Sequence, residues 1–164
     1  MMGLPPTAIL FEGLDVSYHV KIEWNGLTLN EVKRLHSLDL SGKPRQIVFT
    51  RDIFLFTVYT KGMKSDDIFR LTKENVMDGR LTYRQHLTGK EISMPWEHPM
   101  QEIADRYKRK DTPLLFPFIT AKSPREQWKQ YDSLRHRINY NLKKLGLSLG
   151  LSFPLNLTVA CHSW

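Results

Sequence analysis

Cysteine and histidine stand side by side near the end of the sequence, at Cys161 and His162. A thiol and an imidazole within hydrogen-bond reach can serve as a nucleophile and its general base. Adjacent residues on a helix point about 100° apart, however, so sequence neighbours seldom pair in this way. A thiol enzyme is therefore one hypothesis for this chain, and a small, buried, apolar cysteine is the plainer interpretation.

The six histidines show no spacing that is typical of a metal site. Cys161 is the only cysteine, which rules out an internal disulfide and a cysteine-rich zinc site. We therefore expect neither a metal nor another cofactor.

Positive charge is concentrated in one segment of the chain. The whole sequence has 24 Lys and Arg against 17 Asp and Glu, a net charge of +7, and residues 106–144 alone contribute eleven basic residues and three acidic ones. The remainder is close to neutral. Such a basic block is typical of proteins that bind a polyanion, most often nucleic acid, although a solvated surface has the same composition.

Length and hydropathy indicate one globular domain. The chain has 164 residues, of which 41% are hydrophobic and 25% charged, enough to bury a core. No run of 18 apolar residues occurs, and residues 1–6 lack the pattern of a secretory signal. We expect a cytoplasmic domain without a membrane association.

The N-terminal part is expected to contain a strand and a helix. Apolar and polar residues alternate over 16–24, which predicts a half-buried strand that ends at Asn25 and Gly26. Thr28 and Glu31 have the spacing of a capping box and predict a helix that ends before residues 41–44.

The composition of the apolar run 53–59 fits either a strand or a helix, and the residues on both sides of it favour a helix. Thr50 and Asp52 precede it as signals of a helix start, and Gly62 follows it as the expected residue after the helix end, so we predict a buried helix. Ser65 is expected to cap a short second helix.

The remaining elements are a hairpin and two further helices. Apolar residues on both sides of 87–90 predict a β-hairpin, and residues 97–110 predict a helix that leads into an extended connector at 112–117. The longest helix is expected over 125–149. Its predicted core stripe, in which only the arginine is neither apolar nor aromatic, is Trp128, Tyr131, Arg135, Ile138, Leu142 and Leu145.

Several ordered strings resemble tyrosine recombinases, in the form found in integrases of mobile elements. Residues 51–63 and 67–71 resemble the first conserved box of that family, residues 79–89 its catalytic hairpin and residues 157–164 its second box. Shorter stretches at 100–103 and 141–146 are similar to later helices. The resemblance covers roughly residues 20–164.

The resemblance implies an α+β fold, mainly helical, with one small antiparallel sheet and a C-terminal truncation. Residues 1–26 would be a linker and strand remnant, and residues 27–164 a partial integrase catalytic domain. In the family a tyrosine attacks a DNA phosphodiester, two arginines hold the phosphate oxygens, and a hairpin lysine and a histidine transfer protons. No metal or nucleotide is required.

The chain departs from that pattern at the positions which carry the chemistry. Lys61 stands at the place of the first arginine, Leu87 at that of the hairpin lysine, Thr158 at that of a histidine and Cys161 at that of the second arginine, whereas His162 is kept. All six tyrosines precede the second box, so the nucleophile is missing. Each lost charge-stabilising donor costs about 3 kcal/mol of transition-state stabilisation. We therefore expect an inactive recombinase domain.

Weak DNA binding, dominated by the phosphate backbone, is the expected residual property. The residues expected to contact DNA are Lys61, Arg84, His86, Lys90, Lys129, Arg137, Lys143 and Lys144.

A protein–protein role is the alternative. The apolar stretch containing Leu155, Leu157, Val159 and Trp164 could leave an exposed surface that docks on or inhibits an intact integrase, or that forms a homo-oligomer.

Overall fold

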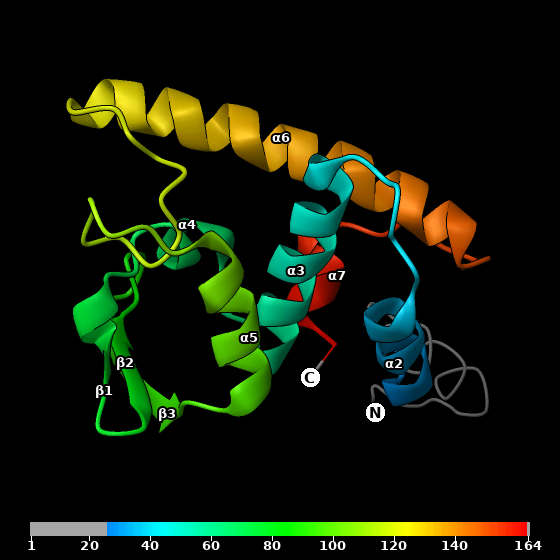
Figure 1. Ribbon diagram of the computed structural model, residues 1–164, viewed down its shortest axis with the longest axis horizontal. Coiled ribbons are helices and arrows are strands. Elements are labelled where there is room, and N and C mark those ends of the chain that lie inside the picture. Colours follow the sequence, from blue (N-terminus) through cyan, green and yellow to red (C-terminus); the bar gives the residue numbers. More distant parts are fainter. Residues whose placement is uncertain (1–25, 164) are drawn as a thin grey trace, which may run out of the picture.

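The computed structural model describes residues 26–163, so the expected strand at 16–24, most of the linker and Trp164 lie outside the described residues. One small sheet lies at one end of the helices and α2 at the other, and the long helix α6 runs along one side of α3 and α7 (Figure 1). The expected α+β class is confirmed. The elements in chain order are α2 (Leu29–Ser37), α3 (Arg45–Tyr59), α4 (Ser65–Ile68), the 3₁₀-helix η1 (Lys73–Asn75), β1 (Val76–Met77), β2 (Arg80–Arg84), β3 (Glu91–Pro95), α5 (His98–Tyr107), α6 (Pro124–Ser148) and α7 (Leu157–Cys161).

The sheet is antiparallel, in the order β1-β2-β3. The predicted hairpin is confirmed, with Leu81 opposite Met94 and Arg84 opposite Glu91. Strand β1 was not predicted, because two residues are too short for a periodic pattern to register. It turns into β2 through Asp78 and Gly79, which both have positive φ, as a two-residue hairpin turn requires.

Helix α3 is the centre of the core. Its middle is buried on every side, with Ile53, Phe54 and Phe56 fully inaccessible, because α5, α6 and α7 all pack against it. A helix that is apolar all round is expected only in such a position. The prediction of a helix rather than a strand over this run is confirmed.

The predicted start of this helix was wrong. The helix begins at Arg45, directly after Pro44, so Thr50 and Asp52 lie inside it rather than at its cap. Thr50 donates its hydroxyl to the Gln46 carbonyl, a bond that satisfies it within the helix. A threonine inside a helix can bond a carbonyl of the preceding turn, and a threonine at the cap can bond an N–H of the first turn. The residue type alone does not distinguish these two positions.

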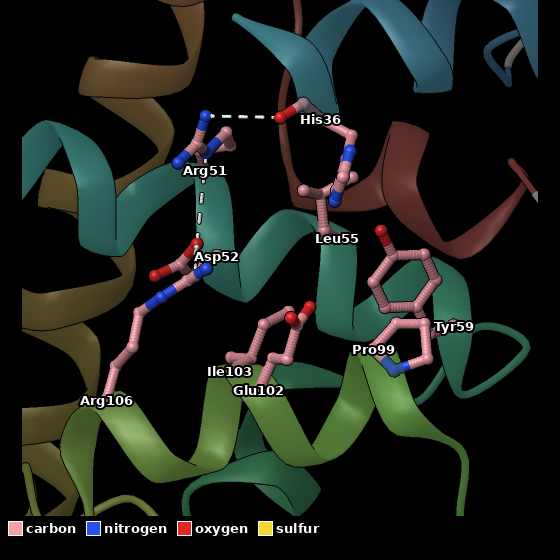
Figure 2. Close-up of a pocket in the computed structure, with 9 residues that line it drawn as sticks. All are labelled: His36, Arg51, Asp52, Leu55, Tyr59, Pro99, Glu102, Ile103 and Arg106. Atoms are coloured by element: carbon pink, nitrogen blue, oxygen red, sulfur yellow. Dashed lines mark hydrogen bonds and ion pairs between the residues drawn. The ribbon is translucent and has the colours of Figure 1, made fainter. Parts of the chain in front are cut away.

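Asp52 joins α3 to α5. Its carboxylate is fully buried and accepts hydrogen bonds from Arg106 Nη1 at 2.7 Å and from the Tyr107 hydroxyl at 2.5 Å. Arg51 and Arg106 approach the carboxylate from opposite sides (Figure 2). A cavity of about 30 Å³ lies next to this cluster. Burial and the bond to Asp52 raise the pKa of Tyr107 far above its ordinary value.

The core stripe of α6 was predicted only in part. Ile138, Leu142 and Leu145 are buried as expected, but Trp128 is 61% exposed and the first buried residue of the helix is Leu134. The first turns of α6 extend beyond the other helices, so the helical spacing continues there without a partner to cover it (Figure 1).

The expectation of an exposed apolar C-terminal surface was wrong for the residues that can be seen. Leu155, Leu157 and Val159 are all buried and belong to the main core. Helix α7 packs on α3 and α6, which accounts for their burial. Among the described residues, no helix is long and apolar enough to cross a membrane.

Candidate nucleic-acid interface

Lys61 lies at the point where α3 ends. Its backbone is left-handed, with φ 61°, and Gly62 follows with φ 94°. The Gly62 N–H donates to the Thr57 carbonyl and the Lys61 N–H to the Val58 carbonyl, which is the hydrogen-bond pattern of a Schellman motif. The residue after the helix cap is therefore Lys61 rather than the predicted Gly62. Its side chain is exposed.

The hairpin loop between β2 and β3 presents Leu87. The loop is closed by hydrogen bonds from the Gln85 N–H to the Lys90 carbonyl and from the Gly89 N–H to the Gln85 carbonyl. His86, Leu87 and Lys90 are all exposed. Arg84 is also exposed, but its guanidinium already donates to the Gly89 carbonyl and pairs with Glu91.

Helix α7 carries Thr158 in its first turn, Cys161 as its last residue and His162 as its C-cap. The Asn156 side chain caps the first turn, and the Leu157 N–H donates to the Asn139 side chain of α6, so the start of the helix is fixed. Thr158 and His162 are exposed, whereas Cys161 is partly buried. Burial raises the pKa of the Cys161 thiol, which disfavours a thiolate nucleophile at neutral pH.

The chain that follows α7 is tied to the start of α2. The Leu27 N–H donates to the Ser163 hydroxyl at 2.6 Å. A side chain at Gly26 would lie 2.0 Å from the His162 carbonyl oxygen, so only glycine allows this approach. Backbone contacts between residues far apart in sequence thus hold His162 in place.

The hairpin loop is attached to the segment that follows Lys61. The Asp67 carboxylate of α4 accepts a 2.9 Å hydrogen bond from the His86 N–H, which holds the hairpin loop against α4. The positive charge of Lys64, at the start of α4, opposes the rise in the pKa of the Cys161 thiol. We call residues 61–67, together with His86, the α3–α4 junction.

Sequence reasoning missed two functional candidates in the junction. Lys64 is exposed and caps α4 through its backbone, and its positive charge acts on the Cys161 thiol. Asp67 is buried, and burial raises the pKa of its carboxyl although the His86 bond acts in the opposite direction. Only the tertiary contacts reveal Lys64, whereas the Asp66-Asp67 pair in a first helical turn was a visible signal.

The other predicted contacts lie on α6. Lys129, Arg137, Lys143 and Lys144 are exposed and fall within about 120° of arc, opposite the buried face of the helix. Lys129 pairs with Glu126, and Lys144 lies over the Tyr140 ring. The Ser65 hydroxyl of the junction and the Tyr131 hydroxyl of α6 lie 2.8 Å apart, so the two elements are joined, whereas the four cations lie on the opposite face of α6.

The fold is that of a tyrosine-recombinase catalytic domain, in agreement with the resemblance of the sequence strings. No protein-family model and no curated protein matches the chain.

The particular similarity is to lambda integrase. A DNA-bound structure of that protein matches 83% of this chain and 48% of its own length, with a TM-score of 0.53 and 18% identity. An integrase dimer on a COC′ core site matches 83% of this chain and 49% of that one, with a TM-score of 0.52 and 17% identity. The chain thus spans about half the length of the integrases it resembles, and at this identity the similarity concerns the fold.

Proposed function

We propose that this chain is a tyrosine-recombinase-like domain that binds the phosphate backbone of duplex DNA without cleaving it. The observation that supports the proposal is the α3–α4 junction, where the exposed Lys61 and Lys64 lie on the segment to which the hairpin loop is attached through Asp67, in a fold similar to that of DNA-bound integrases. Exposed cations held on a fixed backbone suit phosphate contacts, which are independent of sequence.

The absence of cleavage follows from the groups that occupy the junction. Lys61 keeps a positive charge but not the planar fork that gives arginine two parallel bonds to phosphate. Leu87 and Cys161 offer no charged donor at the positions of the hairpin lysine and the second arginine. The described tyrosines with a shifted pKa, Tyr59, Tyr83, Tyr107 and Tyr131, all have it raised by burial, which makes them poor nucleophiles.

Fluorescence anisotropy with a labelled duplex tests the binding. We expect binding at low salt that weakens steeply as salt rises, because each phosphate contact releases a counterion. The double variant Lys61→Ala/Lys64→Ala should weaken binding about tenfold or more and reduce the salt slope by about 1 per lysine.

Lys33 on α2 is an exposed lysine outside the junction, so Lys33→Ala is the matched control. Failure of the native chain to bind at low salt would overturn the proposal. An equal loss of affinity in the control and the double variant would show that DNA does not bind at the junction.

The α6 group is tested with the same duplex. Lys143→Ala/Lys144→Ala should reduce affinity less than the junction double variant if the junction is the principal contact. A larger loss from the α6 pair would place the interface on that helix instead.

A trapping experiment tests the lack of cleavage separately. Incubation with a nicked duplex should give no covalent protein–DNA adduct on a denaturing gel, at protein concentrations that saturate binding. A covalent adduct would refute inactivity and leave the binding proposal intact.

Docking on an intact integrase stays a prediction. The buried positions of Leu155, Leu157 and Val159 remove the apolar surface that motivated it. The similar structures include integrase dimers on DNA, so a second copy is the oligomeric partner to look for, by light scattering with and without duplex.

A further inference from the structure

Leu87 is the most exposed of the large apolar side chains in the described part of the chain, at 78%. It stands at the end of the hairpin loop, not on a helix face that a neighbouring element could cover. Single exposed apolar side chains are common on protein surfaces, so the place of Leu87 in the loop and the charges around it matter more than its exposure alone.

The loop holds Leu87 in a fixed place. Besides the two backbone bonds that close it, the Thr88 hydroxyl donates to the Gln85 side chain at 2.6 Å and the Lys90 N–H donates to the Thr88 hydroxyl. The bond from His86 to Asp67 attaches the loop to α4. A side chain presented by so constrained a loop loses little entropy when it is inserted into a partner.

The charge around Leu87 selects the partner. Arg84, His86 and Lys90 are exposed near it, and Glu91 is the acidic residue that pairs with this group. The other turn of the same sheet has an exposed apolar residue as well, Met77, but there Asp78 follows it directly. Of these two turns, only the Leu87 loop places an exposed apolar side chain between cationic residues.

We propose that Leu87 acts as an apolar wedge that inserts between stacked base pairs from the minor groove while the cations around it contact the backbone. Leucine is among the side chains that unstack a base step in this way. The wedge rests on the proposed DNA binding and adds a preference to it, because flexible TA and CA steps cost least to unstack.

A duplex with 2-aminopurine next to a central TA step reports unstacking directly, since the fluorescence of this base rises when it leaves the stack. We expect the native chain to raise the fluorescence at saturation, and Leu87→Ala and Leu87→Gln to abolish the rise. Both variants should weaken binding to this duplex about threefold to tenfold.

Leu29 on α2 is 69% exposed and provides the matched control. Leu29→Ala should leave both the fluorescence rise and the affinity unchanged. Anisotropy on the same samples separates the two proposals. Binding without a fluorescence rise, or an equal response of the Leu87 and Leu29 variants, overturns the wedge alone, whereas no binding at low salt overturns both.

Discussion

The middle of α3 and the segment just after its end differ in how much of each residue is buried. In the middle of α3, the Asp52 carboxylate is inaccessible to solvent and both of its oxygens are bonded by side chains of α5. At the end of the helix, Lys61 and Lys64 point into solvent, and Leu87 does the same from the hairpin beside them. The first region joins two helices of the fold, and the second is the surface for which we propose DNA binding.

The difference predicts how the two regions tolerate substitution. A buried charge that loses its partners is costly, so substitutions in the first region threaten folding. Substitutions of exposed residues usually change stability by no more than about 0.5 kcal/mol. We therefore expect substitutions of Lys61, Leu87 and Thr158 to leave the architecture intact.

Among the polar residues, the largest effect is expected at Asp52. Asp52→Ala leaves the buried Tyr107 hydroxyl without its acceptor and removes the ion pair with Arg106, so we expect a loss of about 3 kcal/mol in the free energy of unfolding. Asp52→Asn keeps an acceptor and should lose less. Urea denaturation measures both.

Asp105 on α5 is the control for this prediction, because its ion pair with Lys108 is solvent-exposed. Asp105→Ala should change stability by less than about 0.5 kcal/mol. Equal losses at positions 52 and 105 would contradict the contrast between a buried and an exposed carboxylate.

Asp67 stands between the two regions, since it is buried yet holds the hairpin loop of the junction. Asp67→Ala removes the acceptor for the His86 N–H and should cost about 1 kcal/mol. Asp67→Asn retains a carbonyl acceptor and should cost less at neutral pH.

The raised pKa of Asp67 gives this comparison a definite pH dependence. The folded state holds the proton more tightly than the unfolded state, so the native chain loses stability as pH rises from about 4 through the raised value. Asp67→Asn has no such proton. Its stability relative to the native chain should therefore rise over that interval and then level off, and a difference that is flat with pH would refute the assignment.

At Lys61 we expect a substitution that increases stability. A residue other than glycine in the left-handed conformation costs about 1 kcal/mol, so Lys61→Gly should stabilise the fold by about 0.5–1 kcal/mol. Lys61→Ala removes the same charge without relieving the backbone and should give no such gain. If glycine and alanine behave alike in thermal unfolding, the strain at the junction is not significant.

The sequence predicted the local features well because their causes are local. The capping box of Thr28 and Glu31 is present, the hairpin occurs where it was predicted, and the run 53–59 is helical although its helix begins earlier than expected. Features that depend on distant partners were missed. Asp52 was assigned to a helix start because its partners lie more than fifty residues away.

The candidate site shows the same limit. Family strings located Lys61, Leu87 and Cys161, but nothing in the sequence indicated that the charge of Lys64 would act on the Cys161 thiol. Similarly, periodicity placed Trp128 in the core because it cannot tell where a long helix extends past its neighbours.

The smallest effect on folding is expected at Leu87, and this is what makes the wedge variants informative. Leu87→Ala removes a side chain that is already in water, so its free energy of unfolding should stay within about 0.5 kcal/mol of the native value. Leu142→Ala deletes a leucine with no exposed surface and should lose about 2–5 kcal/mol. Urea denaturation of the two variants measures a contrast that depends on burial alone. A large loss at Leu87 would mean that the loop is packed, and its DNA effects could then be ascribed to misfolding rather than to a missing wedge.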